Sequence, residues 1–218
     1  FPEGKTILTG NPLREDIATG DKVEALKHFG LSPNLPTVLS FGGSQGAARI
    51  NKAIVYIITQ LKNKPIFQLI HITGKNHYDK ICEVLVNKGI DLDDMGHIIV
   101  RPYIHQMEKA YAACDLVISR AGAITVSEIS LCGKPAILIP LPTAANDHQN
   151  YNAQSLQENG AGIIVDDENL TGEKLYNTVK SLICDRKKLS NMSIASSKLA
   201  KPDALKIILD EIEVLLNK

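Results

Sequence analysis

Along its whole length the chain alternates between short apolar segments and longer amphipathic ones, and this alternation is the strongest constraint on its fold. Most of the short segments are apolar at every position, as strands buried on both faces of a sheet are. Strands that alternate with helices are typical of a parallel sheet with crossover helices. We therefore predict the α/β fold class, as a Rossmann-like, doubly wound parallel sheet. The predicted strands are residues 6–9, 37–41, 66–72, 98–101, 116–119, 136–139 and 162–165.

The amphipathic segments predict helices near residues 19–29, 45–62, 76–88, 105–113, 123–132, 147–159, 171–184, 186–199 and 203–217. No strand follows the last helix, and a terminal helix of that kind often packs across a neighbouring domain. Because the sequence has no internal repeat or flexible linker, we predict one domain over residues 1–218. The first residue is Phe1 rather than Met, which favours a piece of a longer protein.

The charge balance excludes two classes of partner. Lysine plus arginine and aspartate plus glutamate both total 24, so the formal net charge is zero and no broad basic field attracts nucleic acid or an anionic membrane. The apolar stretches, such as residues 136–141, are far shorter than the roughly 20 residues that span a bilayer. We therefore expect a cytoplasmic chain with no nucleic-acid partner.

Metal and cofactor chemistry also lack a sequence signal. The four cysteines are widely spaced without a C-x-x-C pair, and the six histidines are scattered. Neither a P-loop nor a G-x-S-x-G motif is present, and the G-x-G-x-x-G order of a dinucleotide fold is missing. We expect reduced thiols, no metal site and no cofactor.

The first candidate loop is Gly42-Gly43-Ser44-Gln45-Gly46, between a predicted strand and a predicted helix. Open parallel sheets bind ligands beyond the carboxyl ends of their strands. Glycines let the backbone approach a ligand, and a helix start offers unpaired N–H groups, so this loop suits a diphosphate. A tight turn that merely needs glycine is an equal alternative from this motif alone. The candidate contacts are Gly43, Ser44, Gln45 and Gly46.

The second candidate loop joins a strand end, a glycine turn and a helix start between Ser119 and Glu128. The Glu128 carboxylate could accept hydrogen bonds from both hydroxyls of a ribose. Thr125 and Glu128 also match a capping box, and on this motif alone capping is the favoured interpretation.

The third candidate loop, residues 140–152, is polar and enters a helix after a buried strand. His148, Gln149 and Asn152 offer the mixed donors and acceptors that sugar hydroxyls need. Alternatively, Asp147 caps the helix and the other three are ordinary surface residues.

Two smaller loops follow predicted strands. Arg14 could face a phosphate, although a solvated turn arginine is at least as common, and the backbone of Ile104 could meet the edge of a flat base. Five ligand-like loops at one edge of a sheet are hard to explain as independent turns.

These loops together resemble a known family, the UDP-N-acetylglucosamine transferases that complete lipid II in bacterial peptidoglycan synthesis (the MurG family). The resemblance implies a GT-B glycosyltransferase, in which two Rossmann-like domains face each other across a cleft, and this chain is similar to the C-terminal, donor-binding domain. The segments that carry the likeness are residues 10–14, 42–47, 120–128 and 147–153.

The resemblance also implies a role for each loop. Ser44 and Gln45 would meet the diphosphate and sugar of UDP-N-acetylglucosamine, Glu128 would hold the ribose, and the Ile104 backbone would read uracil. The residues that would line the nucleotide and sugar are Gly122, Ala123, Ile124 and Thr125, with His148, Gln149 and Asn152 at the N-acetylglucosamine hydroxyls.

Two positions depart from the family pattern. Ala121 stands where relatives often carry Ser, and His148-Gln149 replaces an amide pair found in some relatives, so the sugar contacts are expected to differ in detail.

The family's N-terminal domain, which residues 1–218 do not contain, supplies the acceptor loops, the membrane-facing patch and the proposed base. We therefore expect this chain to bind donor without turnover and to hold no catalytic residue, with residues 203–217 packing toward that domain. The intact enzyme would be an inverting, metal-independent transferase that acts on lipid I, peripheral to the cytoplasmic face of the plasma membrane. The alternatives are another GT-B UDP-sugar transferase and a natural single-domain subunit with a separate membrane partner.

Overall fold

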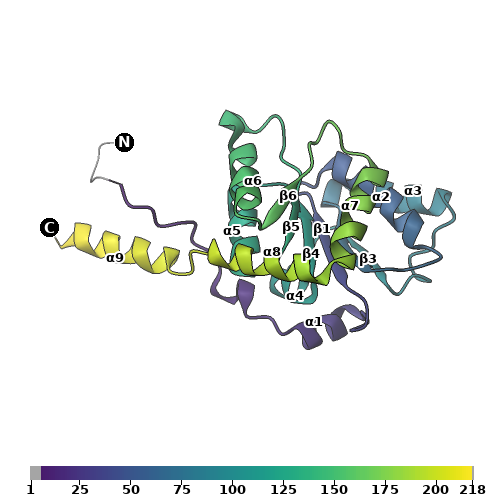
Figure 1. The fold of residues 1–218 in the computed structure, drawn as a ribbon, viewed down its shortest axis with the longest axis horizontal. Helices are drawn as coiled ribbons and strands as arrows, with labels where there is room; N and C mark the ends of the chain where they lie inside the picture. Colours follow the sequence, from purple (N-terminus) through teal and green to yellow (C-terminus); the bar gives the residue numbers. More distant parts are fainter. Residues whose placement is uncertain (1–5, 218) are drawn as a thin grey trace.

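A computed structural model describes residues 6–217. Within them lies a parallel sheet of six strands in the order β3-β2-β1-β4-β5-β6 (Figure 1). The chain winds from β1 outward to β3, returns to β4 beside β1, and winds outward again to β6, which confirms the predicted doubly wound fold. The strands are β1 (Thr37–Phe41), β2 (Gln68–Ile72), β3 (Ile98–Arg101), β4 (Leu116–Ser119), β5 (Ala136–Leu138) and β6 (Gly162–Ile164).

Helices follow every strand, and each predicted α-helix is present. The α-helices are α1 (Lys22–Phe29), α2 (Ala48–Leu61), α3 (Tyr78–Asn87), α4 (Met107–Ala113), α5 (Ala123–Leu131), α6 (His148–Glu158), α7 (Gly172–Cys184), α8 (Arg186–Lys198) and α9 (Ala204–Leu216). Three short 3-10 turns that the sequence did not predict are η1 (Glu15–Ala18), η2 (Lys75–His77) and η3 (Ala145–Asp147).

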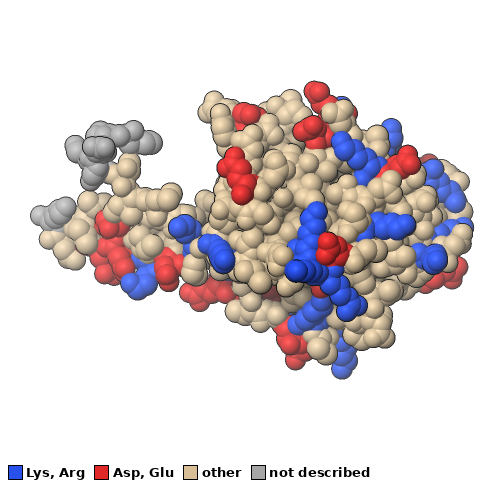
Figure 2. All heavy atoms as spheres, in the orientation of Figure 1, with Lys and Arg blue, Asp and Glu red and all other residues tan. Residues whose placement is uncertain are grey.

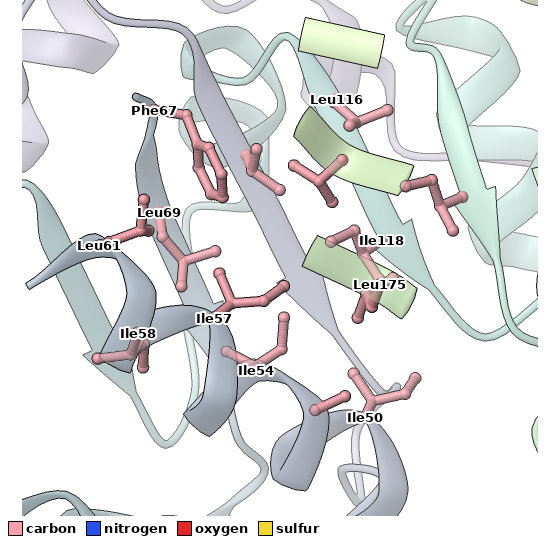
Figure 3. Close-up of a cluster of buried hydrophobic side chains, with 14 of the residues drawn as sticks. Ile50, Ile54, Ile57, Ile58, Leu61, Phe67, Leu69, Leu116, Ile118 and Leu175 are labelled. Carbon is pink, nitrogen blue, oxygen red and sulfur yellow. The ribbon is translucent and has the colours of Figure 1, made fainter. Parts of the chain in front are cut away.

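Both faces of the sheet are covered, which is why its strands are apolar throughout. Alternate residues of each strand point to opposite faces, so in β1 Val38 packs against α2 and α7 while Leu39 packs against α1 and α4. The stripe of Ile50, Ile54 and Ile57 along α2 lies on the first face, as Figure 3 shows. Each such side chain contributes about 1.5–3 kcal/mol when fully buried.

The predicted strand at residues 6–9 is wrong. This segment has no regular structure, and Ile7 and Leu8 are 57% and 86% exposed. Its neighbour Gly10 lies against Lys201 and against Ala204, the first residue of α9. Apolar character alone therefore misled the prediction. Three other predicted strands are shorter than expected: β2 begins at Gln68, β5 ends at Leu138 and β6 ends at Ile164.

Helix α9 extends away from the sheet rather than over it (Figure 1). Ala204 at its start is buried, whereas Leu209, Ile212 and Leu216 farther along are about half or more exposed. The helix is thus confirmed, and its packing toward another domain stays a prediction. No helix in this range is long and apolar enough to cross a bilayer.

Candidate functional site at the switch point of the sheet

The sheet reverses its winding direction between β1 and β4, and ligands of doubly wound sheets bind at such a switch point. The ends of these strands lie side by side, since Phe41 pairs with Ser119 in register. The loops at residues 42–46 and 120–122 therefore flank the switch point, where sheets of this class form a ligand-binding crevice. These are the two loops that the sequence singled out first, and the structure brings them together.

The glycine-rich loop is interlocked with the loop after β2. A Cβ atom at Gly46, whose φ is +78°, would lie 2.1 Å from the Thr73 carbonyl oxygen, and one at Gly74 would lie 2.6 Å from the Gly46 nitrogen. Asn51 of α2 fixes this contact, because its Nδ2 donates to the same Thr73 oxygen over 2.9 Å. Glycine is thus required at residue 46 by a close approach of two backbones. The turn interpretation and the ligand interpretation of this loop are compatible.

Helices α2 and α5 both begin at the crevice with open N-termini. Their N-cap residues are Ala47 and Gly122, and in the described structure no side chain caps either helix. The capping-box interpretation of Thr125 and Glu128 is therefore wrong, since Thr125 is the third residue inside α5. Both helix starts follow neighbouring strand ends and offer unpaired N–H groups and a partial positive charge, which suits an anion.

Glu128 is half-buried on α5, and its Oε2 accepts a hydrogen bond of 3.0 Å from the hydroxyl of Tyr111 on α4. Burial raises the pKa of the Glu128 carboxyl above its usual value, while the Tyr111 bond and the charge of Arg14 oppose that rise. The carboxylate is thus held in a fixed place near the crevice. Its use as a ribose ligand, inferred from the resemblance, stays a prediction.

Two amide side chains of the third loop hold the second loop in place. The Gln149 Oε1 accepts hydrogen bonds from the backbone N–H groups of Ala121 and Leu141, and Asn152 Nδ2 donates to the Ala121 carbonyl over 2.9 Å. Gln149 and Asn152 therefore lie at the crevice, as expected, but part of their hydrogen-bonding capacity fixes the start of α5. Their contact with a sugar stays a prediction.

The entry to α6 is strained. Asn146 and Asp147 have positive φ angles of 50° and 56°. The sequence suggested that Asp147 caps α6. Asp147 is the N-cap residue, but its carboxylate accepts a hydrogen bond from the Asn150 side chain and does not cap the helix backbone. His148 is exposed, and its Nδ1 lies 2.6 Å from the Ala145 carbonyl oxygen, so Nδ1 is the donor of this bond, and in the neutral ring Nε2 is an acceptor.

The two smaller loops differ in how they reach the crevice. Arg14 lies beside α4, with its guanidinium 3.4 Å from the Glu108 carboxylate and 3.7 Å from Asp16, so its proposed phosphate contact stays a prediction. Ile104 lines a cavity of about 320 Å³ at the end of β3, together with Tyr103 and His105. A larger cavity, of about 650 Å³, lies at the opposite edge of the sheet.

Sequence reasoning missed an ion-pair network that ties the loops together. Asp167, only 7% exposed and two residues beyond Val165, has one carboxylate oxygen 2.6 Å from Arg120 Nη1 and the other 3.1 Å from Arg49 Nε. Arg120 also donates to the carbonyls of Ile139 and Pro140. The network therefore joins the starts of α2 and α5 to the loops after β5 and β6. The sequence did contain one signal for this network, since Asp167 is an acidic residue just after the predicted strand at residues 162–165.

Charged side chains and potential metal ligands are distributed as follows. Basic and acidic side chains are interspersed over the face in Figure 2, without a broad field of one sign. Among residues 6–217, no group of three histidine, cysteine or acidic residues is placed to hold a metal ion. The four cysteines are free.

The winding of the sheet and the loops at its switch point define the doubly wound α/β class. Within that class, residues 37–208 match the glycosyltransferase family 28 C-terminal domain, and the chain belongs to this family. It is 42% identical over 211 residues to the UDP-N-acetylglucosamine–N-acetylmuramyl-(pentapeptide) pyrophosphoryl-undecaprenol N-acetylglucosamine transferase of Desulforamulus reducens, covering 97% of this chain and 57% of the relative. The enzyme of the same name from Halothermothrix orenii is 42% identical over 209 residues, covering 96% and 56%. The chain thus spans just over half the length of these relatives.

Solved structures give the same picture. The crystal structure of Acinetobacter baumannii MurG superimposes with a TM-score of 0.75 at 27% identity, over 98% of this chain and 57% of that protein. A structure of Staphylococcus aureus MnaA with UDP has a TM-score of 0.64 at 15% identity, over 88% and 48%, which is a likeness of fold alone. The expected family is confirmed.

Proposed function

We propose that this chain is the donor-binding part of a transferase that moves N-acetylglucosamine from UDP to lipid I, forming lipid II for peptidoglycan. The observation that carries the proposal is the pair of open helix starts, α2 and α5, that face one crevice beside the Glu128 carboxylate. The names of relatives at 42% identity support the choice of donor and acceptor.

The diphosphate would lie against the N–H groups at the starts of α2 and α5. As the bond from the sugar to UDP breaks, negative charge develops on the leaving diphosphate. Preorganised N–H groups and helix dipoles stabilise such charge without reorganising during the reaction. Glu128 would accept hydrogen bonds from the two ribose hydroxyls, and the Ile104 backbone would contact the uracil edge.

The sugar would lie toward α6. Gln149 Oε1 is engaged with backbone N–H groups, so its Nε2 is the group left to donate to a hydroxyl. His148 Nε2 would accept from a second hydroxyl. Together they would supply the mixed donors and acceptors that sugar hydroxyls need.

The remaining functions would belong to the part of the relatives that has no counterpart in this chain. We infer that this part binds lipid I, provides the catalytic base and contacts the cytoplasmic face of the plasma membrane, because the acceptor named for the relatives is attached to undecaprenol. It would also cover the exposed apolar residues of α9. Replacing Leu209 and Ile212 by Ser should then leave donor affinity of this chain unchanged but lower the activity of a protein that contains both parts.

Calorimetric titration of UDP-N-acetylglucosamine and UDP-glucose into this chain tests the donor site. Removing a charged hydrogen-bond acceptor costs about 1.5–3 kcal/mol, so Glu128→Ala should weaken binding by roughly 10- to 150-fold. Glu83→Ala is the matched control, because Glu83 is exposed on α3 and removes a carboxylate elsewhere. We expect its affinity to equal that of the unaltered chain.

Three results would contradict the proposal. The first is no saturable binding at millimolar donor, and the second is equal affinity of Glu128→Ala and the unaltered chain. The third is formation of lipid II by this chain alone, which would show that the acceptor site is not in a separate part.

A further inference from the structure

Tyr111 is a buried residue that contacts Glu128, the candidate ribose-binding residue. Its side chain is 1% exposed on α4, and the hydroxyl donates to Glu128 Oε2 over 3.0 Å. The ring is fixed by an edge-to-face contact with Phe41, with centroids 6.2 Å apart at 86°. Phe41 is the last residue of β1, directly before the glycine-rich loop. One buried ring therefore joins the carboxylate on α5 to the strand that carries the diphosphate loop.

The direction of the Tyr111 hydrogen bond is fixed by chemistry. Burial, reinforced by the charge of Glu128, raises the pKa of the Tyr111 hydroxyl well above its usual value, so the phenol stays protonated. A phenol has a single donor, and here it is used on Glu128. The bond leaves Oε1 and the second acceptor site of Oε2 for a ligand, because each carboxylate oxygen accepts two hydrogen bonds.

A half-buried glutamate without such a support would pay to order its side chain when a ligand binds. The Tyr111 hydrogen bond orders the Glu128 side chain in the folded protein before the ligand binds, so less conformational entropy is lost on binding. The hydrogen bond also favours the ionised form of Glu128, against the burial that raises its pKa.

We propose that Tyr111 is a positioning residue for ribose recognition: its hydroxyl holds the Glu128 carboxylate oriented toward a vicinal diol. The proposal rests on the donor site proposed above and adds a residue that contacts neither the sugar nor the phosphates. Tyr111 acts only through Glu128, so its effect must depend on the ribose hydroxyls of the ligand.

The test compares UDP with 2′-deoxy-UDP by calorimetry. Tyr111→Phe removes only the hydroxyl, and we expect the preference for UDP over 2′-deoxy-UDP to fall by about 3- to 10-fold, the size of one hydrogen bond. Affinity for 2′-deoxy-UDP should fall less than affinity for UDP, because only the 3′ hydroxyl remains to contact Glu128. Tyr176→Phe is the matched control, because Tyr176 lies on the opposite face of the sheet against Phe67.

A double-mutant cycle separates positioning from a general loss of structure. In a Glu128→Ala background, Tyr111→Phe should cause no further loss of preference, since the carboxylate that it orients is gone. As a second measurement, the pKa of the Glu128 carboxyl, followed by carbon NMR, should be higher in Tyr111→Phe. The other charged group that influences this carboxyl is the Arg14 guanidinium, and it is retained in the variant.

The outcomes are distinguishable. If the unaltered chain does not bind UDP, or if Glu128→Ala keeps its preference for the ribonucleotide, the proposed donor site fails. If Glu128→Ala loses that preference but Tyr111→Phe keeps it, the donor site stands and the role of Tyr111 is refuted. An equal loss in both backgrounds would also refute it.

Discussion

The interlocked glycine turns allow a paired prediction in which one substitution controls for the other. Gly43 and Gly46 lie in the same loop with φ angles of +87° and +78°. Alanine at either position must adopt a backbone conformation that side chains disfavour. A Cβ at Gly43 meets no atom within 4 Å, whereas one at Gly46 would lie 2.1 Å from the Thr73 carbonyl oxygen and 2.9 Å from the His77 ring.

The two substitutions should therefore differ by the cost of the clash alone. Left-handed backbone costs a non-glycine residue about 1–2 kcal/mol, and this term is shared by Gly43→Ala and Gly46→Ala. Relieving the clash requires the two loops to separate, and overpacking of this kind adds about 1–3 kcal/mol. The separation would also pull the Thr73 carbonyl from Asn51, a bond of 2.9 Å. We expect Gly46→Ala to be less stable than Gly43→Ala by about 2 kcal/mol.

Urea unfolding of both variants, followed by circular dichroism, measures this difference directly. Calorimetry with UDP should show the same order, because the start of α2 moves with the loop in Gly46→Ala. Equal stability of the two variants would refute the argument, since it would mean that the loops separate at no cost.

Two further predictions concern buried charged and titratable groups. Burial lowers the pKa of His71 from its usual 6.5 to about 4. Between pH 6.5 and pH 4 the unfolded chain therefore binds more protons than the folded chain. The free energy of unfolding should fall by up to about 3 kcal/mol as the pH falls through this range. His71→Gln should flatten this dependence in urea unfolding at pH 7, 6 and 5, and parallel curves for the two proteins would contradict the assignment. Asp167→Asn should cost about 3 kcal/mol, because it leaves the nearly buried Arg120 without its counter-charge. Arg49→Gln should cost less than about 1 kcal/mol, because the Arg49 side chain is more than half exposed. Thermal unfolding of both variants measures the two losses of stability, and a larger loss for Arg49→Gln than for Asp167→Asn would contradict the network.

The sequence allowed the fold to be predicted because each strand is buried on both faces. For the strands Thr37–Phe41, Ile98–Arg101 and Leu116–Ser119, the predicted and observed ends coincide. Residues 6–9 failed because a short apolar run has the same composition whether or not a partner strand is available. Pairing is a property of the whole sheet, and its edges are already formed by β3 and β6.

The loops of the candidate site could be predicted, but their supports could not. A glycine turn between a strand and a helix is visible in sequence, as at residues 42–46. Tyr111 is one aromatic residue in a helix, and nothing local indicates that it reaches Glu128, 17 residues away. Asn51 did leave a signal, as a buried polar residue between the isoleucines of α2. Its partner is the Thr73 backbone carbonyl in the loop after β2, and no local pattern in the sequence indicates this pairing.

The pairing of β1 with β4 has a consequence for synthesis of the chain. β1 is fully buried in the finished sheet, yet its second neighbour is residues 116–119, which leave the ribosome long after residue 41. Until then the first three strands expose an apolar edge with unpaired backbone groups, the kind of surface that invites association between nascent chains. The central position that lets β1 carry the candidate site thus makes it the strand most in need of protection during translation.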